Sequence, residues 1–372
     1  MKIPTQSPRN ILLSPLEWGL GHATRLSSII EELLNDNHKV IIAADGLPYN
    51  FLQKRFPQLT IERLPLKQIV YAQSKRGFFF KLLVQMPGFF RSIKNTRSSI
   101  DQLVKKYNID LIISDNRYGF IHPDIPSVFI THQLRPMPPK PWRYGQSIFG
   151  YFHLWLLRKY EFIWVADFEG EENVVGKLSK IPWKNKRIRH IGPQSWLRKF
   201  ETNLENKPPE YDILVMLSGP EPHRTELENK LLSILGDLPE KRIIVLQGLP
   251  EGESESPLDN SNGSIRIVNH LPGEQITKLI KNTPTIICRA GVVTVFDLCV
   301  LKRPAMLIPT PGQTEQEYVA EYLDQKGYFS YIDQSRLSLE KIIDYENSHH
   351  KTFANSSVEA FRKALDEFIQ LA

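Results

Sequence analysis

Residues 10–34, NILLSPLEWGLGHATRLSSIIEELL, join an apolar run to an amphipathic helical pattern through a turn that contains two glycines and a histidine. The run NILLSP has the character of a buried strand, and LSSIIEELL has apolar residues at helical spacing. Gly19 and Gly21 allow the backbone to approach a ligand closely, and the N-terminus of the following helix presents free N–H groups. This order of strand, turn and helix predicts an α/β fold with a ligand site at the turn.

The same alternation of short apolar runs and helical patterns continues through both halves of the chain, which indicates parallel βαβ units. The predicted strands are residues 10–15, 38–45, 59–65, 109–115, 126–132, 162–167, 211–218, 241–248, 264–270, 285–291 and 303–310. A polar, proline-bearing linker is expected at 201–212. The expected domains are therefore 1–200 and 201–355, and a C-terminal helix within 356–372 is expected to pack back on the first domain.

The composition is that of a soluble globular protein large enough for two domains, with 372 residues, 41% of them hydrophobic and 24% charged. Cys288 and Cys299 lack the spacing of a metal or redox site, which suits buried thiols in a reducing compartment. The polar start has no export signal, and no apolar run reaches the length of a membrane span. We therefore expect a cytoplasmic protein.

The charge is unevenly distributed. Residues 1–200 contain 30 Lys and Arg against 15 Asp and Glu, whereas residues 201–372 contain 17 against 26. This asymmetry indicates an anionic partner for the first half, namely lipid headgroups, a phosphorylated substrate or nucleic acid.

Residues 54–106 hold 12 cationic side chains against two acidic ones, interleaved with the aromatic run GFFFKLLVQMPGFF. We interpret this stretch as an element that binds an anionic membrane surface, with a core helix bearing a solvated basic face as the alternative.

Polar side chains stand at the carboxyl ends of the predicted strands, where doubly wound domains bind ligands. His22 follows the first strand and Asp115 ends another, so the carboxylate could orient the imidazole as a general base for a hydroxyl. The alternatives are a capping or core histidine and an aspartate that caps its turn. A dinucleotide site would need a third glycine, and Arg25 follows Thr24 instead.

The second half has a matching set of turns. Ser218 and Gly219 follow one strand and suit a phosphate cradle, as does the turn from Arg289 through Ala290 to Gly291. Asp297, one turn into the next helix, could bind a ribose diol or could simply be a first-turn acid favoured by the helix dipole.

A further turn, PTPGQTEQ, brings Glu315 and Gln316 to the start of a helix. Adjacent acceptor and amide groups suit the hydroxyls of a sugar. A capping box or a solvated helix start is the alternative.

Three stretches of the chain together resemble the GT-B glycosyltransferases, specifically the MurG-like family 28 enzymes and their relatives. They are GLGHATR at 19–25, HLPGEQITKLI at 270–280 and TIICRAGVVTVFDLCVLKRPAMLIPTPGQTEQEYVAEYL at 285–323. The resemblance spans both halves, and its C-terminal part is the most specific. It implies an α/β fold with two doubly wound Rossmann-like domains facing each other across a cleft. It also implies that the second domain holds a nucleotide-sugar donor, usually a UDP-sugar, and that the first binds the acceptor.

The resemblance implies roles for individual residues. His22 would be the catalytic base, supported by Asp115. The implied donor-binding residues are Leu271 at the base, Asp297 at the ribose, Ser218, Gly219, Arg289, Ala290 and Gly291 at the phosphates, and Glu315 and Gln316 at the sugar. The implied acceptor side consists of Gly19, Gly21, Arg25, Asn116, Arg117 and His132, with Arg25 anchoring the turn or an acceptor phosphate.

Some features depart from the MurG pattern. The first turn lacks the form GGTGGH, and SGPEP stands where a GGS loop is expected, which argues against the MurG reaction itself. The turn GHATR also resembles that of nucleotide-sugar hydrolases with this fold.

The interpretation we favour is an inverting glycosyltransferase of the hexosyltransferase type. It needs no metal, because no DxD-like pair stands at a strand end, and no cofactor beyond the nucleotide-sugar co-substrate. The expected acceptor is a hydroxyl of a lipid-linked or membrane-associated molecule, with the protein peripheral on the inner face of the cell membrane. Nucleic acid is not an expected partner. The alternatives are a nucleotide-sugar hydrolase and a non-catalytic nucleotide-sugar-binding regulator.

Overall fold

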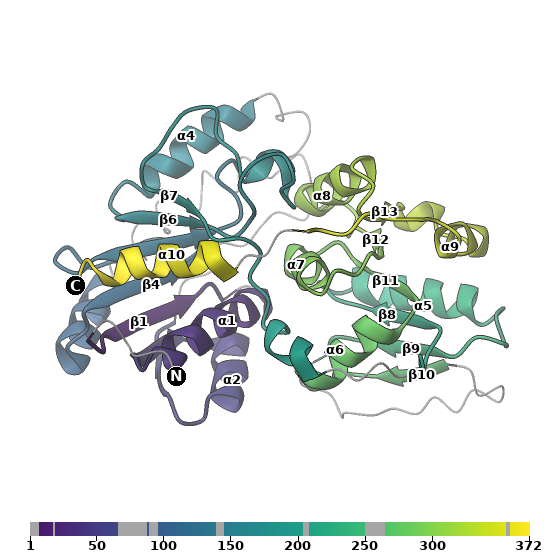
Figure 1. Ribbon diagram of the computed structural model, residues 1–372, viewed down its shortest axis with the longest axis horizontal. Coiled ribbons are helices and arrows are strands. Elements are labelled where there is room, and N and C mark those ends of the chain that lie inside the picture. The colour runs from purple at the N-terminus through teal and green to yellow at the C-terminus, as the bar shows by residue number, and fades with distance from the viewer. Residues whose placement is uncertain are drawn as a thin grey trace. The chain divides into compact units, whose positions relative to one another are not determined.

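The chain forms two compact units in a computed structural model (Figure 1). The structure describes residues 7–17, 19–65, 88, 96–138, 145–203, 208–249, 265–354 and 358–372. Unit 1 comprises Met1–Asn173, Lys177–Gln194 and Ser356–Ala372, and unit 2 comprises Val174–Gly176 and Ser195–Asn355. The aromatic run at 77–90 and the polar loop at 251–264 lie outside the described residues, apart from Gly88.

Unit 1 contains a seven-stranded parallel sheet in the order β3-β2-β1-β4-β5-β6-β7. Its strands are β1 (Asn10–Pro15), β2 (Lys39–Ala44), β3 (Thr60–Arg63), β4 (Leu111–Asp115), β5 (Ser127–Thr131), β6 (Phe162–Val165) and β7 (Ile188–His190). Its helices include α1 (Gly21–Asn35), α2 (Gly46–Arg55), α4 (Gln146–Leu156) and α10 (Val358–Ile369). Every residue of β4 and β5 is buried, as expected for parallel strands covered on both faces.

The last helix, α10, completes unit 1. Phe361 and Phe368 meet the ring of Trp164 on β6 edge to face, with centroid distances of 5.8 and 5.6 Å. Arg362 forms ion pairs with Glu32 and Asp36 at the end of α1. The last helix therefore packs on β6 and is tied by ion pairs to the end of α1.

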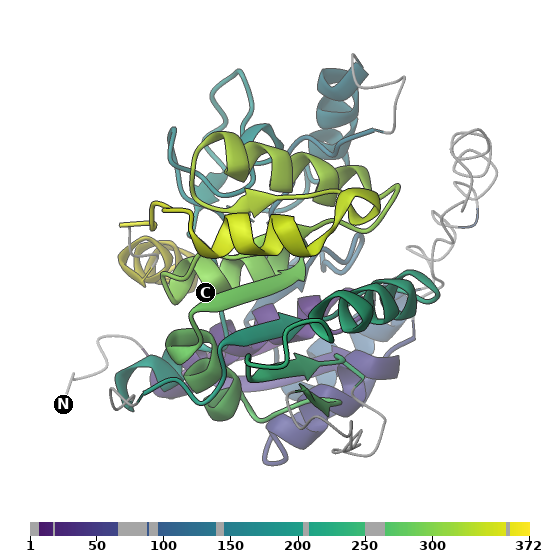
Figure 2. The ribbon, with the colours of Figure 1, turned by 90° about the vertical axis from the view of Figure 1, so that its right-hand side faces the viewer.

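Unit 2 repeats the topology with a six-stranded parallel sheet in the order β10-β9-β8-β11-β12-β13. Its strands are β8 (Ile213–Met216), β9 (Ile243–Leu246), β10 (Ile265–Val268), β11 (Thr285–Arg289), β12 (Met306–Ile308) and β13 (Ser330–Tyr331). Its helices are α5 (His223–Leu235), α6 (Gly273–Asn282), α7 (Val292–Val300), α8 (Thr314–Gln325) and α9 (Leu339–Glu346), and Figure 2 gives a second view of them. Short 3₁₀ turns lie at Gly176–Leu178, Arg198–Asn203 and Gln334–Arg336.

The structure confirms the predicted α/β class and the doubly wound topology. Both sheets follow the strand order in which the first strand lies between the second and the fourth, so each has a switch point next to its first strand. In unit 1 this point lies between β1 and β4, and in unit 2 between β8 and β11. The short strands β7 and β13 were not expected from the sequence.

Candidate active site

The first site residues lie at the switch point of unit 1, where β1 and β4 end next to each other. The chain leaves β1, turns at Gly19 with a φ of +64° and begins α1 at Gly21. His22 therefore stands in the first turn of α1, whose leading N–H groups cannot bond within the helix. Asp115 is the last residue of β4 and the register partner of Pro15. This edge of a doubly wound sheet is where ligands bind.

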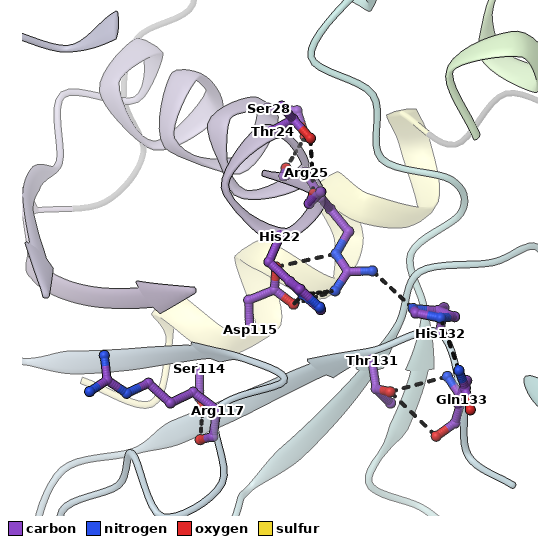
Figure 3. Close-up of polar contacts among 11 residues, drawn as sticks. His22, Thr24, Arg25, Ser28, Ser114, Asp115, Arg117, Thr131, His132 and Gln133 are labelled. Carbon is purple, nitrogen blue, oxygen red and sulfur yellow. Dashed lines mark hydrogen bonds and ion pairs between the residues drawn. The ribbon is translucent and has the colours of Figure 1, made fainter. Parts of the chain in front are cut away.

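Arg25 joins His22 and Asp115 to a second histidine (Figure 3). It lies three residues after His22, on the same face of α1. Its Nε donates to Asp115 Oδ2 at 3.2 Å, its Nη2 donates to Asp115 Oδ1, and its Nη1 lies 3.1 Å from Nδ1 of His132. Because a guanidinium only donates, Nδ1 of His132 must accept this bond. The four side chains form one connected polar network.

The network is buried except at His22. Asp115 is fully buried and Arg25 is 1% exposed, whereas the side chain of His22 is 15% exposed. Burial raises the pKa of Asp115, but the charge of Arg25 and the contact with His22 outweigh it, so the pKa lies below its usual value. Burial also lowers the pKa of His22, with Asp115 opposing this effect and Arg25 adding to it. A neutral imidazole therefore faces an ionised carboxylate.

His22 Nδ1 has two competing partners. It lies 2.9 Å from Nη2 of Arg25, from which it would accept, and 3.3 Å from Oδ1 of Asp115, to which it would donate. Only the second arrangement puts the proton on Nδ1 and leaves the Nε2 lone pair available as a base. Arg25 and Asp115 together thus decide which nitrogen of His22 can take a proton.

The structure does not bring the guanidinium of Arg117 to this network. Arg117 is fully buried, and its guanidinium donates to Ser14 Oγ and to the backbone oxygens of Ala43 and Leu64. It therefore ties together the ends of β1, β2 and β3 instead of facing an acceptor. Asn116, which adopts a φ of +55°, makes the turn between Asp115 and Arg117.

The switch point of unit 2 gathers small residues from three loops. Gly219, with a φ of +103°, follows β8, and a Cβ atom built on it would meet Thr310 Oγ1 at 3.4 Å. A Cβ atom on Gly291 would lie 4.0 Å from Ser218 Oγ. Thr310 is 1% exposed, and its hydroxyl finds no hydrogen-bond partner among the described residues. The sequence did not single out Thr310, although it also follows a strand.

Arg289 does not face a ligand in this arrangement. It is 1% exposed, and it donates to the backbone oxygens of Pro309 and His223 and to the side chain of Gln334. Burial lowers its pKa to about 10. The guanidinium therefore holds the ends of β11 and β12 against the start of α5, while the turn through Ala290 to Gly291 leads directly into α7.

Asp297 lies beside a pocket within unit 2. Ser195 donates a hydrogen bond to its Oδ1, and burial raises the pKa of Asp297 to about 7 in spite of that bond. The pocket has a volume of about 160 Å³ and includes Leu271. It is lined by Trp196, Leu197, Met216, Leu217, Leu246, Gly248, Asn269, His270, Leu271, Ile276, Ile280, Thr294 and Asp297. The structure thus brings Asp297 and Leu271 together, and the sequence missed Ser195 because it lies 102 residues from Asp297.

Glu315 and Gln316 stand in the first turn of α8. The side-chain oxygen of Gln316 accepts from the N–H of Thr310 at 2.8 Å, and its amide nitrogen donates to Gln313. Gln316 therefore holds the loop that carries the Thr310 hydroxyl. Glu315 is partly exposed at the helix start.

Metal-binding clusters and membrane-spanning helices are two further features to consider. Within the described ranges, no group of three or more His, Cys, Asp or Glu side chains is placed to hold a metal ion. None of the helices described is long and apolar enough to cross a membrane. Metal independence and membrane association stay predictions.

Comparison with solved structures identifies the fold. The glycotransferase of kitacinnamycin matches with a TM-score of 0.60 at 14% identity, covering 98% of this chain and 96% of its own. MurG from Acinetobacter baumannii matches with a TM-score of 0.56 at 15% identity, covering 98% and 100%. These likenesses show the GT-B fold, with two Rossmann-like domains.

A family model matches most of the second half of the chain. Residues 226–370 match the model of the glycosyltransferase family 28 C-terminal domain. This part of the chain is similar to the family 28 C-terminal domain, which confirms the resemblance found in the sequence.

A curated relative is the UDP-N-acetylglucosamine--N-acetylmuramyl-(pentapeptide) pyrophosphoryl-undecaprenol N-acetylglucosamine transferase of Clostridium tetani, 26% identical over 176 residues. The match covers 45% of this chain and 46% of that relative, so it spans about half of each.

Proposed function

We propose that this protein transfers a sugar from a nucleotide-sugar to an acceptor hydroxyl. The observation that carries the proposal is the network of His22, Asp115 and Arg25 at the switch point of unit 1. It occurs in a chain whose residues 226–370 match the family 28 C-terminal domain. An imidazole that is partly accessible and is backed by a buried carboxylate is the arrangement that general-base catalysis needs.

In the proposed reaction, His22 is the base. With its Nδ1 proton donated to Asp115, Nε2 takes the proton of the acceptor hydroxyl as that oxygen attacks the anomeric carbon. The new carbon–oxygen bond forms as the bond to the diphosphate breaks, and the nucleoside diphosphate leaves. A single displacement of this kind inverts the anomeric carbon. Asp115 stabilises the imidazolium that results.

The donor site of the proposal is the switch point of unit 2. Ser218, Gly219 and the turn before α7 supply hydroxyl and backbone donors for a diphosphate without a metal ion. Helix N-termini there oppose the charge that develops on the leaving group. The buried hydroxyl of Thr310 adds one more donor to this cradle.

The pocket beside Asp297 suits the nucleoside. Its volume of about 160 Å³ is close to that of a cavity that admits one benzene ring, roughly 150 Å³, which favours a single-ring base such as uracil. Asp297 would then face the ribose hydroxyls. The curated relative named above uses a UDP-sugar and a pyrophosphoryl-undecaprenol acceptor, which supports a UDP-sugar and a lipid-linked acceptor as the specific form of the proposal.

Water as the acceptor is the second candidate function, since the same base could deprotonate water. Release of nucleoside diphosphate from a UDP-sugar, measured with and without candidate acceptors, separates the two. Release that depends on an acceptor supports transfer, and release in buffer alone at the same rate supports hydrolysis.

The variant His22→Gln tests whether His22 is the general base. His349→Gln, which changes an exposed histidine, is the matched control. His22→Gln should lower turnover roughly 10²- to 10⁴-fold, because a general base contributes that much, while donor binding is unchanged. The control should retain full turnover. A His22→Gln protein with wild-type turnover would remove the base from the proposal.

A further inference from the structure

The segment 195–197 forms one wall of the pocket beside Asp297 in unit 2. Trp196 and Leu197 line this pocket, and Ser195 bonds to Asp297. The segment lies at the start of the main stretch of unit 2, which begins at Ser195. It precedes residues 226–370, the part of the chain that matches the family 28 C-terminal domain. This wall of the pocket therefore comes from a stretch of chain that the matched domain does not include.

Trp196 is held in this wall by close packing. Its ring meets that of Phe200 edge to face, with a centroid distance of 6.4 Å. A Cβ atom built on Gly273, the first residue of α6, would lie 2.7 Å from a ring carbon of Trp196, a distance that real Cβ atoms essentially never show. Helix α6 can therefore start against this ring only because residue 273 is a glycine, and the packing fixes the backbone beside Ser195.

The hydroxyl of Ser195 is oriented toward Asp297. Ser195 is 1% exposed, and its Oγ accepts a hydrogen bond from the N–H of Leu197 at 3.1 Å. Its O–H donates to Oδ1 of Asp297, which as a carboxylate oxygen can only accept. A hydrogen bond to an ionised group is about twice as strong as one between neutral groups. The Leu197 N–H and Asp297 together therefore leave the hydroxyl a single orientation.

Ser195 occupies only one oxygen of Asp297. Asp297 is 9% exposed and lines the pocket, and among the described residues no donor is bonded to its Oδ2. Burial raises the pKa of Asp297, whereas the bond from Ser195 lowers it. The lining residues from β8, β9 and α6 carry no charge, and His270 is the other titratable side chain among those that line the pocket. Ser195 is therefore the polar contact that favours the ionised form of Asp297.

We propose that Ser195 is a positioning residue of the donor site, which binds Oδ1 of Asp297 and so directs the free Oδ2 to accept the hydroxyls of a ribose. The inference rests on the proposed function, because it takes the pocket to hold the nucleoside of the donor. A carboxylate that is already held in place loses little side-chain freedom when the ligand binds. In the same segment, Trp196 and Leu197 supply an apolar wall for the base. A short stretch outside the matched domain thus contributes to recognition of both the base and the ribose.

Calorimetric titration of the full chain at pH 7 and at pH 9 tests this role. The ligand is UDP, or whichever of TDP, GDP and CMP binds more tightly. The variants are Ser195→Ala, which removes the hydroxyl, and Ser195→Thr, which keeps it. Ser233→Ala, at an exposed position on α5, is the matched control. Dividing each affinity by that of the wild type at the same pH cancels the titration of the ligand's own phosphates.

Ser195→Ala should weaken binding, and the loss at pH 7 should exceed the loss at pH 9 by roughly tenfold. The pKa of Asp297 rises when its donor is removed, so less of the carboxylate is ionised at pH 7, whereas at pH 9 it is largely ionised in both proteins. Ser195→Thr should recover most of the lost affinity. Ser233→Ala should bind like the wild type at both pH values.

Two results would overturn the inference while leaving the proposed function in place. One is wild-type affinity in Ser195→Ala at pH 7. The other is a loss of the same size at pH 7 and pH 9, which a merely structural role of Ser195 would produce. Failure of the proposed function looks different, because the wild type itself would then bind none of the four nucleotides, and the inference would fall with it.

Discussion

At the scale of single residues, Arg25 decides the chemistry available to His22. It is a positioning residue, because it contacts His22, Asp115 and His132 but is itself buried. Its bidentate contact keeps Asp115 ionised, and its charge lowers the pKa of His22. A base with a lowered pKa stays neutral, and therefore active, further into the acid range.

The pH profile of turnover tests this role. In the wild type, the acid limb of kcat/KM should have its midpoint below pH 6.5, because burial and the charge of Arg25 lower the pKa of His22. In Arg25→Gln the second of these causes is gone, so the acid limb should move to higher pH.

Arg25→Lys keeps the positive charge but loses the planar guanidinium that donates two bonds to Asp115. This variant should keep the acid limb of the wild-type pH profile, with a reduced kcat. If Arg25 had only a structural role, replacing it would lower the amount of folded protein and leave the acid limb of the pH profile unchanged. An acid limb in Arg25→Gln that coincides with that of the wild type would therefore contradict the assignment.

The residue scale is also where the sequence was least informative. The motif GHATR and the strand end at Asp115 were enough to pair His22 with Asp115. They could not show that Arg25 would bridge three partners, or that the guanidinium of Arg117, expected on the acceptor side, would point into the sheet. Residue type and spacing predict position along an element, but the direction of a long side chain depends on contacts with residues that here lie 53 to 107 positions away.

At the scale of elements, α4 places a histidine in an apolar core. His153 is 4% exposed, and it packs near the rings of Tyr118 and Phe129 at 5.7 and 6.2 Å. Burial lowers the pKa of His153 to about 4. The bond between its Nδ1 and the backbone oxygen of Leu134 only partly opposes this effect.

This histidine should make unit 1 sensitive to acid. The unfolded chain binds the proton near pH 6.5 and the folded chain only near pH 4, so stability falls as the pH drops through that window, by up to about 3 kcal/mol. His153→Phe should remove this share of the pH dependence in urea unfolding at pH 7 and pH 4.5. His349→Gln serves as the exposed control. Equal pH dependence in His153→Phe and the wild type would show that His153 does not titrate in this way.

The elements themselves were largely predictable. All the strands expected from apolar runs are present, because buried parallel strands must be apolar on both faces. The strands β7 and β13 were missed because they have only 3 and 2 residues and lie at the sheet edges, where burial leaves little pattern.

At the scale of the whole molecule, the chain carries two sheets of the same doubly wound order, each with its polar residues at the switch point. The sequence predicted this arrangement because strand ends can be read from apolar runs. It could not predict that Ser195, which precedes the expected linker, would bond to Asp297 in unit 2. Unit 1 in turn includes α10 from the far end of the chain.

The central claim is that unit 2 binds a nucleotide-sugar for transfer. Calorimetric titration of the full chain with UDP-, TDP-, GDP- and CMP-sugars tests it most directly, with Asp297→Asn as the site variant and the exposed Asp237→Asn as the control. We expect selective binding of one nucleotide class, which Asp297→Asn weakens at least roughly tenfold by removing the carboxylate from the ribose, while Asp237→Asn binds like the wild type. Binding of none of these nucleotide-sugars, or equal binding by Asp297→Asn, would show that unit 2 does not bind the donor in this way.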